Sequence, residues 1–130
     1  MRIAIPIWED KVSPVFDTSS RLLIVEIEDQ REASRFVTYL DVQDLSQRCF
    51  RIHGLGVDTL LCGAISRPFS RMLVAFGINI IPWITGNTED VLRAYLQGTI
   101  FHPSFLMPGC KRNRLRQRKK RKEHGHGKKI

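Results

Sequence analysis

Hydrophobic residues alternate with other residues along the first third of the chain, which is the period of a β-strand. Isoleucines occupy every second position of residues 3–7, and residues 21–28 are dense in Leu, Ile and Val before they alternate with Glu. A polar turn at 29–32 separates this segment from a third apolar segment at 34–40. The pattern predicts three strands, of which the second and third form an antiparallel hairpin.

Two features interrupt this pattern. Pro6 lies inside the first predicted strand and has no backbone N–H to donate to a ladder, so we expect the strand to bulge or its pairing to end there. Residues 9–20 show no hydrophobic period and contain several turn-forming residues, which predicts a loop. Twelve residues make a long loop for a compact domain, and such loops are often functional.

The apolar spacing lengthens after Asp44. Leu45, Cys49 and Ile52 are four and three residues apart, so they share one face of a helix that Gly54 ends. The chain then shows two strand–helix units.

Continuous apolar runs at 59–65 and 78–84 predict two buried strands of a parallel sheet. Amphipathic stretches at 66–77 and 89–96 predict a helix after each of them. The predicted order is βββαβαβα, an antiparallel hairpin unit followed by right-handed crossovers. This order indicates a single α/β domain with a mixed sheet, in the arrangement of ribonuclease-H-like folds.

The positive charge of the chain is concentrated at its C-terminal end. The chain carries +8 in total, but residues 1–110 hold 10 Lys or Arg against 12 Asp or Glu, whereas residues 111–130 hold 11 against one. A block of like charges with almost nothing apolar to bury is predicted to be disordered. We therefore expect a folded domain over 1–110 and a disordered basic tail over 111–130.

Composition narrows the class of protein further. The length of 130 residues suits one domain, and no apolar run reaches the roughly 18 residues that a membrane helix needs. The apolar start of the chain is also too short for a signal peptide, so we expect no transmembrane segment and a cytoplasmic location. Three widely spaced cysteines exclude a disulfide scaffold and a C-x-x-C zinc motif.

The sequence contains no motif that indicates an enzyme. There is no glycine-rich phosphate-binding pattern, and no Ser or Cys has a base at motif spacing. Ribonuclease-H-like nucleases bind metal ions with carboxylates, one of them on the first strand, where this chain has isoleucines; Glu9 and Asp10 follow only in the loop. The sequence therefore predicts a non-catalytic binding domain.

Four stretches in order along the chain resemble a known family. They are residues 1–6, the loop 13–17 with the strand 22–28, residues 56–66, and residues 76–92. Together they are similar to the NifX/NafY-like nitrogenase accessory proteins, which are dinitrogenase iron-molybdenum cofactor biosynthesis domains, over roughly residues 1–98. The resemblance implies a ribonuclease-H-like fold without its catalytic carboxylates.

The resemblance also implies a role with metal–sulfur clusters. Better-known members bind iron-sulfur or iron-molybdenum clusters in transit, so we expect a transiently bound cluster of this kind and a cluster donor or acceptor protein as partner. Many relatives carry His-Phe-Gly-Arg in the first loop, where this chain has Val-Phe-Asp-Thr at 15–18, so a histidine ligand is absent there. The segment 107–110 followed by a basic tail resembles a sub-branch of the family.

Thiolates are the first candidates for ligands of such a cluster. Cys49 lies on the apolar helical stripe and is expected to be buried. Cys62 comes at the end of a predicted parallel strand and before a helix, where ligands bind and thiol pKa values fall, but core packing explains it equally well. Cys110 has no periodic neighbours, so we expect it to be exposed, as a ligand or as an incidental thiol. The candidate metal ligands are Cys62 and Cys110.

Two loops are expected at the same edge of the sheet as these thiols. The carboxyl ends of parallel strands meet at one edge, and open α/β sheets bind ligands there. The candidate cluster-site residues are Ser13, Phe16 and Asp17 in the first loop, and Thr85, Gly86 and Asn87 after the last strand.

The basic tail supports two interpretations. It can be a solvated segment that aids solubility, or it can bind a polyanion such as RNA or DNA, with the domain as an inert scaffold. The tail has no aromatic residue to stack on a base, so binding would not be sequence-specific. The candidate polyanion-binding residues are Lys111, Arg112, Arg114, Arg116, Arg118, Lys119, Lys120, Arg121 and Lys122.

Overall fold

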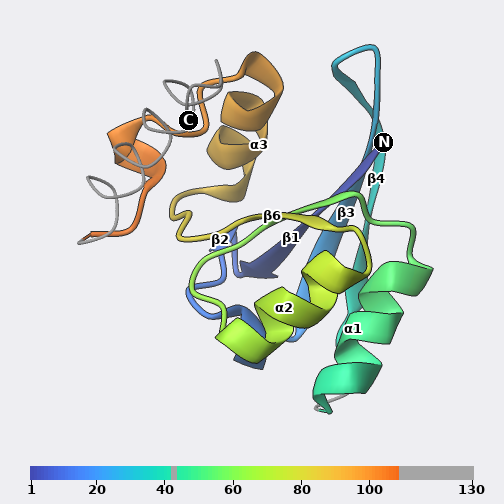
Figure 1. Ribbon diagram of the computed structural model, residues 1–130. Coiled ribbons are helices and arrows are strands. Elements are labelled where there is room, and N and C mark those ends of the chain that lie inside the picture. The colour runs from blue at the N-terminus through green and yellow to red at the C-terminus, as the bar shows by residue number, and fades with distance from the viewer. Residues whose placement is uncertain (42–43, 109–130) are drawn as a thin grey trace, which may run out of the picture.

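A six-stranded mixed sheet forms the centre of the molecule, with helices on both faces (Figure 1). The computed structural model describes residues 1–41 and 44–108. The strand order is β4-β3-β1-β5-β6, and a short β2 pairs with β1. The strands are β1 (Arg2–Trp8), β2 (Lys11–Val12), β3 (Arg21–Glu28), β4 (Arg31–Tyr39), β5 (Thr59–Leu61) and β6 (Asn79–Ile81).

The strand directions confirm the predicted mixed sheet. β1 pairs antiparallel with β3 and parallel with β5, and β5 pairs parallel with β6. β3 and β4 form the predicted hairpin.

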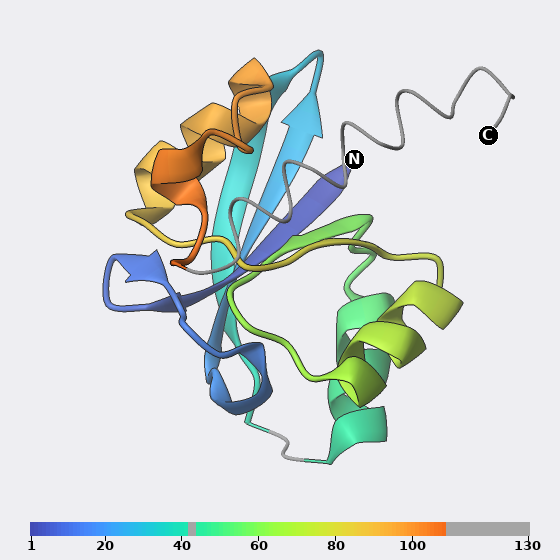
Figure 2. The same ribbon diagram turned by 60° about the vertical axis from the view of Figure 1, so that its left-hand side comes forward.

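The three predicted helices are present, and side chains cap the first and the third of them. They are α1 (Leu45–Gly54), α2 (Arg67–Ala75) and α3 (Thr88–Gln97), together with the short 3-10 turns η1 (Phe16–Thr18) and η2 (Pro103–Phe105). The Asp44 side chain accepts a hydrogen bond from the N–H of Gln47, and the Asn87 side chain accepts one from the N–H of Glu89. In both views, α1 and α2 lie on one face of the sheet and α3 lies on the other (Figure 2).

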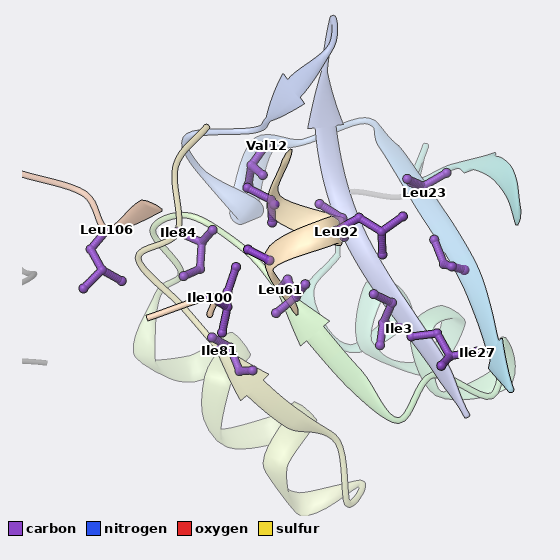
Figure 3. Close-up of a cluster of buried hydrophobic side chains, with 14 residues drawn as sticks. Ile3, Val12, Leu23, Ile27, Leu61, Ile81, Ile84, Leu92, Ile100 and Leu106 are labelled. Atoms are coloured by element: carbon purple, nitrogen blue, oxygen red, sulfur yellow. The ribbon is translucent and has the colours of Figure 1, made fainter. Parts of the chain in front are cut away.

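Alternation along the strands divides the core into two halves. In β1, Ile3 and Ile5 pack on the α3 side, while Ala4 packs on the side of α1 and α2. Figure 3 shows the α3 half, whose labelled side chains come from strands, from α3, from loops and from the end of the described chain: Ile3, Val12, Leu23, Ile27, Leu61, Ile81, Ile84, Leu92, Ile100 and Leu106. Burial on both faces explains the continuous apolar runs in the sequence.

Pro6 ends pairing on one side of β1 only. The antiparallel register with β3 continues through Pro6, opposite Leu22, and reaches Ile7. The parallel register with β5 covers Ile3 and Ala4 and stops before Pro6. The carbonyl of Pro6 instead accepts a hydrogen bond from Ser13 at 2.8 Å, so the strand needs no bulge at the proline.

Several predicted boundaries were wrong. The runs 59–65 and 78–84 contain strands of only three residues each, because loops rather than ladder partners bury the apolar residues that follow. β4 begins at Arg31 because Asp29 and Gln30, with φ angles of 54° and 63°, make the turn alone. The predicted loop 9–20 contains β2 and η1.

Candidate functional site at the carboxyl end of the parallel strands

The first loop, residues 9–20, lies directly against the loop that joins β5 to α2. Phe16 N–H donates to the carbonyl of Ala64, and Ala64 N–H donates to the carbonyl of Pro14, both at 2.8 Å. A Cβ atom on Gly63 would lie 2.5 Å from the Pro14 carbonyl oxygen and 2.7 Å from that of Ser13. Only glycine allows this approach, so the two loops form one surface.

The loop after β6 and the last described segment join the same edge. Val12 N–H donates to the carbonyl of Gly86 at 3.0 Å, and Met107 N–H donates to the carbonyl of Trp83 at 2.8 Å. Leu106 is buried in the α3 half of the core, so this segment is part of the fold. The structure therefore brings together the two loops that the sequence places at one edge of the sheet.

Four of the predicted site residues have side chains that make contacts within the fold, and the first is Ser13, whose hydroxyl donates to the Val15 carbonyl at 3.3 Å. Thr85 contributes its backbone N–H, which donates to the Phe105 carbonyl at 2.7 Å. Phe16 is fully buried and packs edge-to-face on Phe69, with ring centroids 5.3 Å apart. The Asp17 carboxylate accepts a hydrogen bond from the N–H of Ser66 at 3.0 Å, and Asn87 caps α3. These side chains position the loops, and their contact with a ligand stays a prediction.

A pocket of about 370 Å³, here called the first-loop pocket, opens beside these contacts. Hydroxyl side chains line one part of it, and apolar side chains, including Trp8 at 57% exposure, line the rest. Its lining residues are Ile7, Trp8, Ser13, Pro14, Val15, Thr18, Ser19 and Ser20.

A second pocket, of about 440 Å³, lies between α3 and the η2 segment. It contains Gly86 and Asn87 at its rim, together with the ion pair of Asp90 and Arg93 at 3.1 Å. Charges of both signs line it, so it offers no net attraction to an ion.

Arg48 of α1 is a buried cation beneath the first loop. The side chain is fully buried, and its Nη1 donates to the Ser19 carbonyl at 2.8 Å. Its guanidinium carbon lies 5.7 Å from the centroid of the Phe16 ring. Nε and Nη2 have no hydrogen-bond partner within the part of the chain that the structure describes. Burial lowers the pKa of Arg48, and the charge of Asp17 opposes that effect.

Sequence reasoning missed Arg48, although a signal was present. Position 48 lies three residues after Leu45 and four before Ile52, so it falls on the apolar stripe of α1 rather than on its solvent face. An arginine on such a stripe indicates a buried charge.

Comparison with protein families identifies the fold. Residues 1–98 match the family model described as dinitrogenase iron-molybdenum cofactor. The chain belongs to this family. The match covers the whole sheet, the three helices, the first loop and the loop that joins β5 to α2. It confirms the family resemblance seen in the sequence.

Solved structures share the fold of this chain. PH0822 superposes with a TM-score of 0.72 at 26% identity, over 75% of this chain and 90% of that one. The mj0327 protein of Methanocaldococcus jannaschii gives 0.64 at 23% identity, over 76% and 90%. The apo form of the orange protein of Desulfovibrio gigas gives 0.60 at 19% identity, over 75% and 88%. No curated protein matches the chain.

In this member of the dinitrogenase iron-molybdenum cofactor family, two cysteines are buried within the core. Cys49 is fully buried as expected, and burial raises the pKa of its thiol to about 11. Cys62 is also fully buried, in the half of the core beneath α1 and α2, and its N–H donates to the Ile81 carbonyl at 3.1 Å. A ligand role for Cys62 therefore requires the segment over it to move.

Other predicted residues lie outside the described part of the chain. These are Cys110 and the nine basic candidates from Lys111 to Lys122. Within residues 1–41 and 44–108, no group of three or more His, Cys, Asp or Glu side chains is arranged to hold a metal ion. None of the helices in these ranges is long and apolar enough to cross a membrane.

Proposed function

We propose that the protein binds a metal–sulfur cluster of the iron-sulfur or iron-molybdenum type as cargo and passes it between a donor and an acceptor protein. The observation that carries this proposal is the meeting of the first loop with the loops after β5 and β6, at the edge where open α/β sheets bind ligands. Membership of the dinitrogenase iron-molybdenum cofactor family supports the class of cargo.

Cys110 and Cys62 are the proposed thiolate ligands, with Cys110 first. Met107 is held to Trp83 at this edge, and Cys110 follows three residues later in the sequence, which supports Cys110 as the first candidate. Cys62 lies at the end of β5 under Gly63 and would join once that segment opens. Remaining ligands come from the partner protein or from small thiols.

The proposed role is non-catalytic. β1 carries Ile3, Ile5 and Ile7 where ribonuclease-H-like nucleases have a metal-binding carboxylate, which supports a carrier over an enzyme. Three widely spaced cysteines suit a reducing compartment, which supports a cytoplasmic location.

Anaerobic reconstitution tests the proposal. Iron and sulfide, or a preformed cluster on a donor protein, should give visible absorption and a fixed number of metal ions per chain. Cys110→Ser should lose most of the bound metal and Cys62→Ser part of it, while Cys49→Ser, at a buried cysteine that is not a proposed ligand, is the matched control. A wild-type protein that gains no chromophore by either route would overturn the carrier function.

A further inference from the structure

Arg48 is a positive charge held under the first-loop pocket without a full set of partners. We propose that this pocket binds an anion and that Arg48 is the buried charge that attracts it. The identification of that anion with a metal–sulfur cluster rests on the proposed function; the binding of an anion does not.

The burial of Arg48 is not explained by stability. A guanidinium has five N–H donors, and here one bond to Ser19 and contact with the Phe16 ring are the described contacts of a fully buried group. None of the ion pairs found within the described residues includes Arg48. A buried charge without an ionic partner destabilises a fold, so its presence calls for another role.

The position of Arg48 supplies that role. The Ser19 carbonyl that accepts from Nη1 belongs to a residue that lines the pocket, so the guanidinium is bonded directly to the backbone of the pocket wall. No charged side chain is among the lining residues, and Arg48 is the buried charge bonded to one of them. Thr18 and Ser20 are exposed at the rim and present hydroxyls that can donate to an anion.

Asp17 is the nearby opposite charge, and it is engaged elsewhere. Its Oδ1 accepts from the Ser66 N–H at the start of α2, and it forms no ion pair with Arg48 in the structure. Asp17 therefore weakens the field of Arg48 without cancelling it. This arrangement predicts opposite effects on anion binding when one or the other charge is removed.

The pocket chemistry favours an anion with a soft surface. Trp8 and Val15, both more than 40% exposed, supply polarisable and apolar walls beside the hydroxyls. Sulfur atoms of an anionic metal–sulfur cluster fit such walls better than the strongly hydrated oxygens of phosphate. The pocket therefore favours a polarisable, weakly hydrated anion, which the proposed function identifies as a metal–sulfur cluster.

Calorimetric titration of the full metal-free chain with thiosulfate, at 150 mM salt to screen the tail, tests the inference. Arg48→Met should weaken thiosulfate binding by at least about tenfold, because it removes a charge in a low-dielectric site, and Arg48→Lys should retain most of it. Asp17→Asn keeps an acceptor for Ser66 and should strengthen binding about threefold. Arg51→Met removes an exposed charge from the same helix and is the matched control.

Thermal melting separates binding from folding. Arg48→Met should melt at or above the wild-type temperature, because it removes a poorly partnered buried charge.

Three results of the thiosulfate titration would overturn the inference: wild-type affinity in Arg48→Met, equal losses of affinity in Arg48→Met and Arg51→Met, or no binding by any variant. Thiosulfate binding that depends on Arg48 in a protein that takes up no cluster would refute the carrier function alone. A cluster retained fully by Arg48→Met, with no thiosulfate binding, would refute the anion pocket alone.

Discussion

At the scale of single residues, Gly63 sets how closely the first loop and the β5–α2 loop approach. A methyl group there would meet backbone oxygens of Pro14 and Ser13, which cannot rotate away as a side chain can. We expect Gly63→Ala to lower the free energy of unfolding by about 2–3 kcal/mol, the usual cost of overpacking. Thermal or denaturant unfolding measures it.

Gly54 provides the matched control for that substitution. It ends α1, and no heavy atom lies within 4 Å of the position that an added methyl group would take, so Gly54→Ala should be neutral or stabilise by up to about 1 kcal/mol. Equal stability of the Gly63→Ala and Gly54→Ala variants would show that the first loop and the β5–α2 loop can move apart without lowering the free energy of unfolding.

Cys49 makes stability depend on alkaline pH. Burial raises the pKa of its thiol to about 11, above the roughly 8.5 of an unfolded cysteine. The unfolded chain therefore releases this proton first, so stability is complete below the unfolded value and falls as pH rises toward the folded one. Denaturant titrations between pH 8 and 11 should show a shallower decline in Cys49→Ala than in the wild type.

The three thiols should also react in a fixed order. Cys49 and Cys62 are fully buried, whereas Cys110 follows the last described residues and lies outside any periodic apolar segment of the sequence. Timed alkylation of the native protein with peptide mapping should therefore label Cys110 first and both others only with unfolding. Rapid labelling of Cys62 would show that the segment over it opens without cargo.

At the scale of elements, one arginine ties the outer strand β4 to α3. Arg35 donates to both oxygens of Glu89, at 2.6 and 3.0 Å, and also to Glu32. The pairs are partly exposed, so Arg35→Gln should cost only about 0.5–1 kcal/mol, and less at high salt. Hydrogen bonds from Arg35 lower the pKa of both carboxyls, so this stability is lost as pH falls through their folded values. Unfolding at pH 7 and at successively lower pH should show the difference between Arg35→Gln and the wild type shrink in acid.

The element order could be predicted from sequence, and the strand lengths could not. Alternation and capping residues identify β1, β3 and the three helices, since those signals are local. The run from Cys62 to Ile65 is as apolar as a strand. Its Ala64, however, bonds to Pro14 and Phe16 of the first loop instead of continuing the β5 ladder. Only the tertiary fold distinguishes these two ways to bury the same residues.

At the scale of the whole molecule, the charge separation between domain and tail predicts a simple truncation result. Residues 1–110 carry a net charge of −2 and residues 111–130 carry +10. Removal of 111–130 should abolish binding to DNA or RNA and shift the melting temperature by no more than about 1 °C, since the tail has little apolar surface to bury. Binding isotherms at several salt concentrations measure the first effect, and thermal unfolding measures the second. Tight DNA binding by the truncated protein would place the DNA-binding surface on the folded domain.

The location of the candidate site could be inferred from sequence more readily than its chemistry. The rule for parallel strands brings the loops of Ser13 and Gly86 to one edge, as observed. Residue type alone does not show that Phe16 and Asp17 hold the loops together, because the same side chains serve ligands in other settings. The bond between the buried Arg48 and the first loop could not be predicted, because it depends on how α1 packs against that loop.

The bonds that join these loops link residues far apart along the chain. Phe16 pairs with Ala64, 48 positions later, and Val12 pairs with Gly86, 74 positions later. Contacts of such long separation form late in folding, because the intervening chain must first be ordered. A chain emerging from the ribosome therefore cannot complete this surface until Gly86 has been synthesised, so any ligand of this surface can bind only to a nearly finished domain.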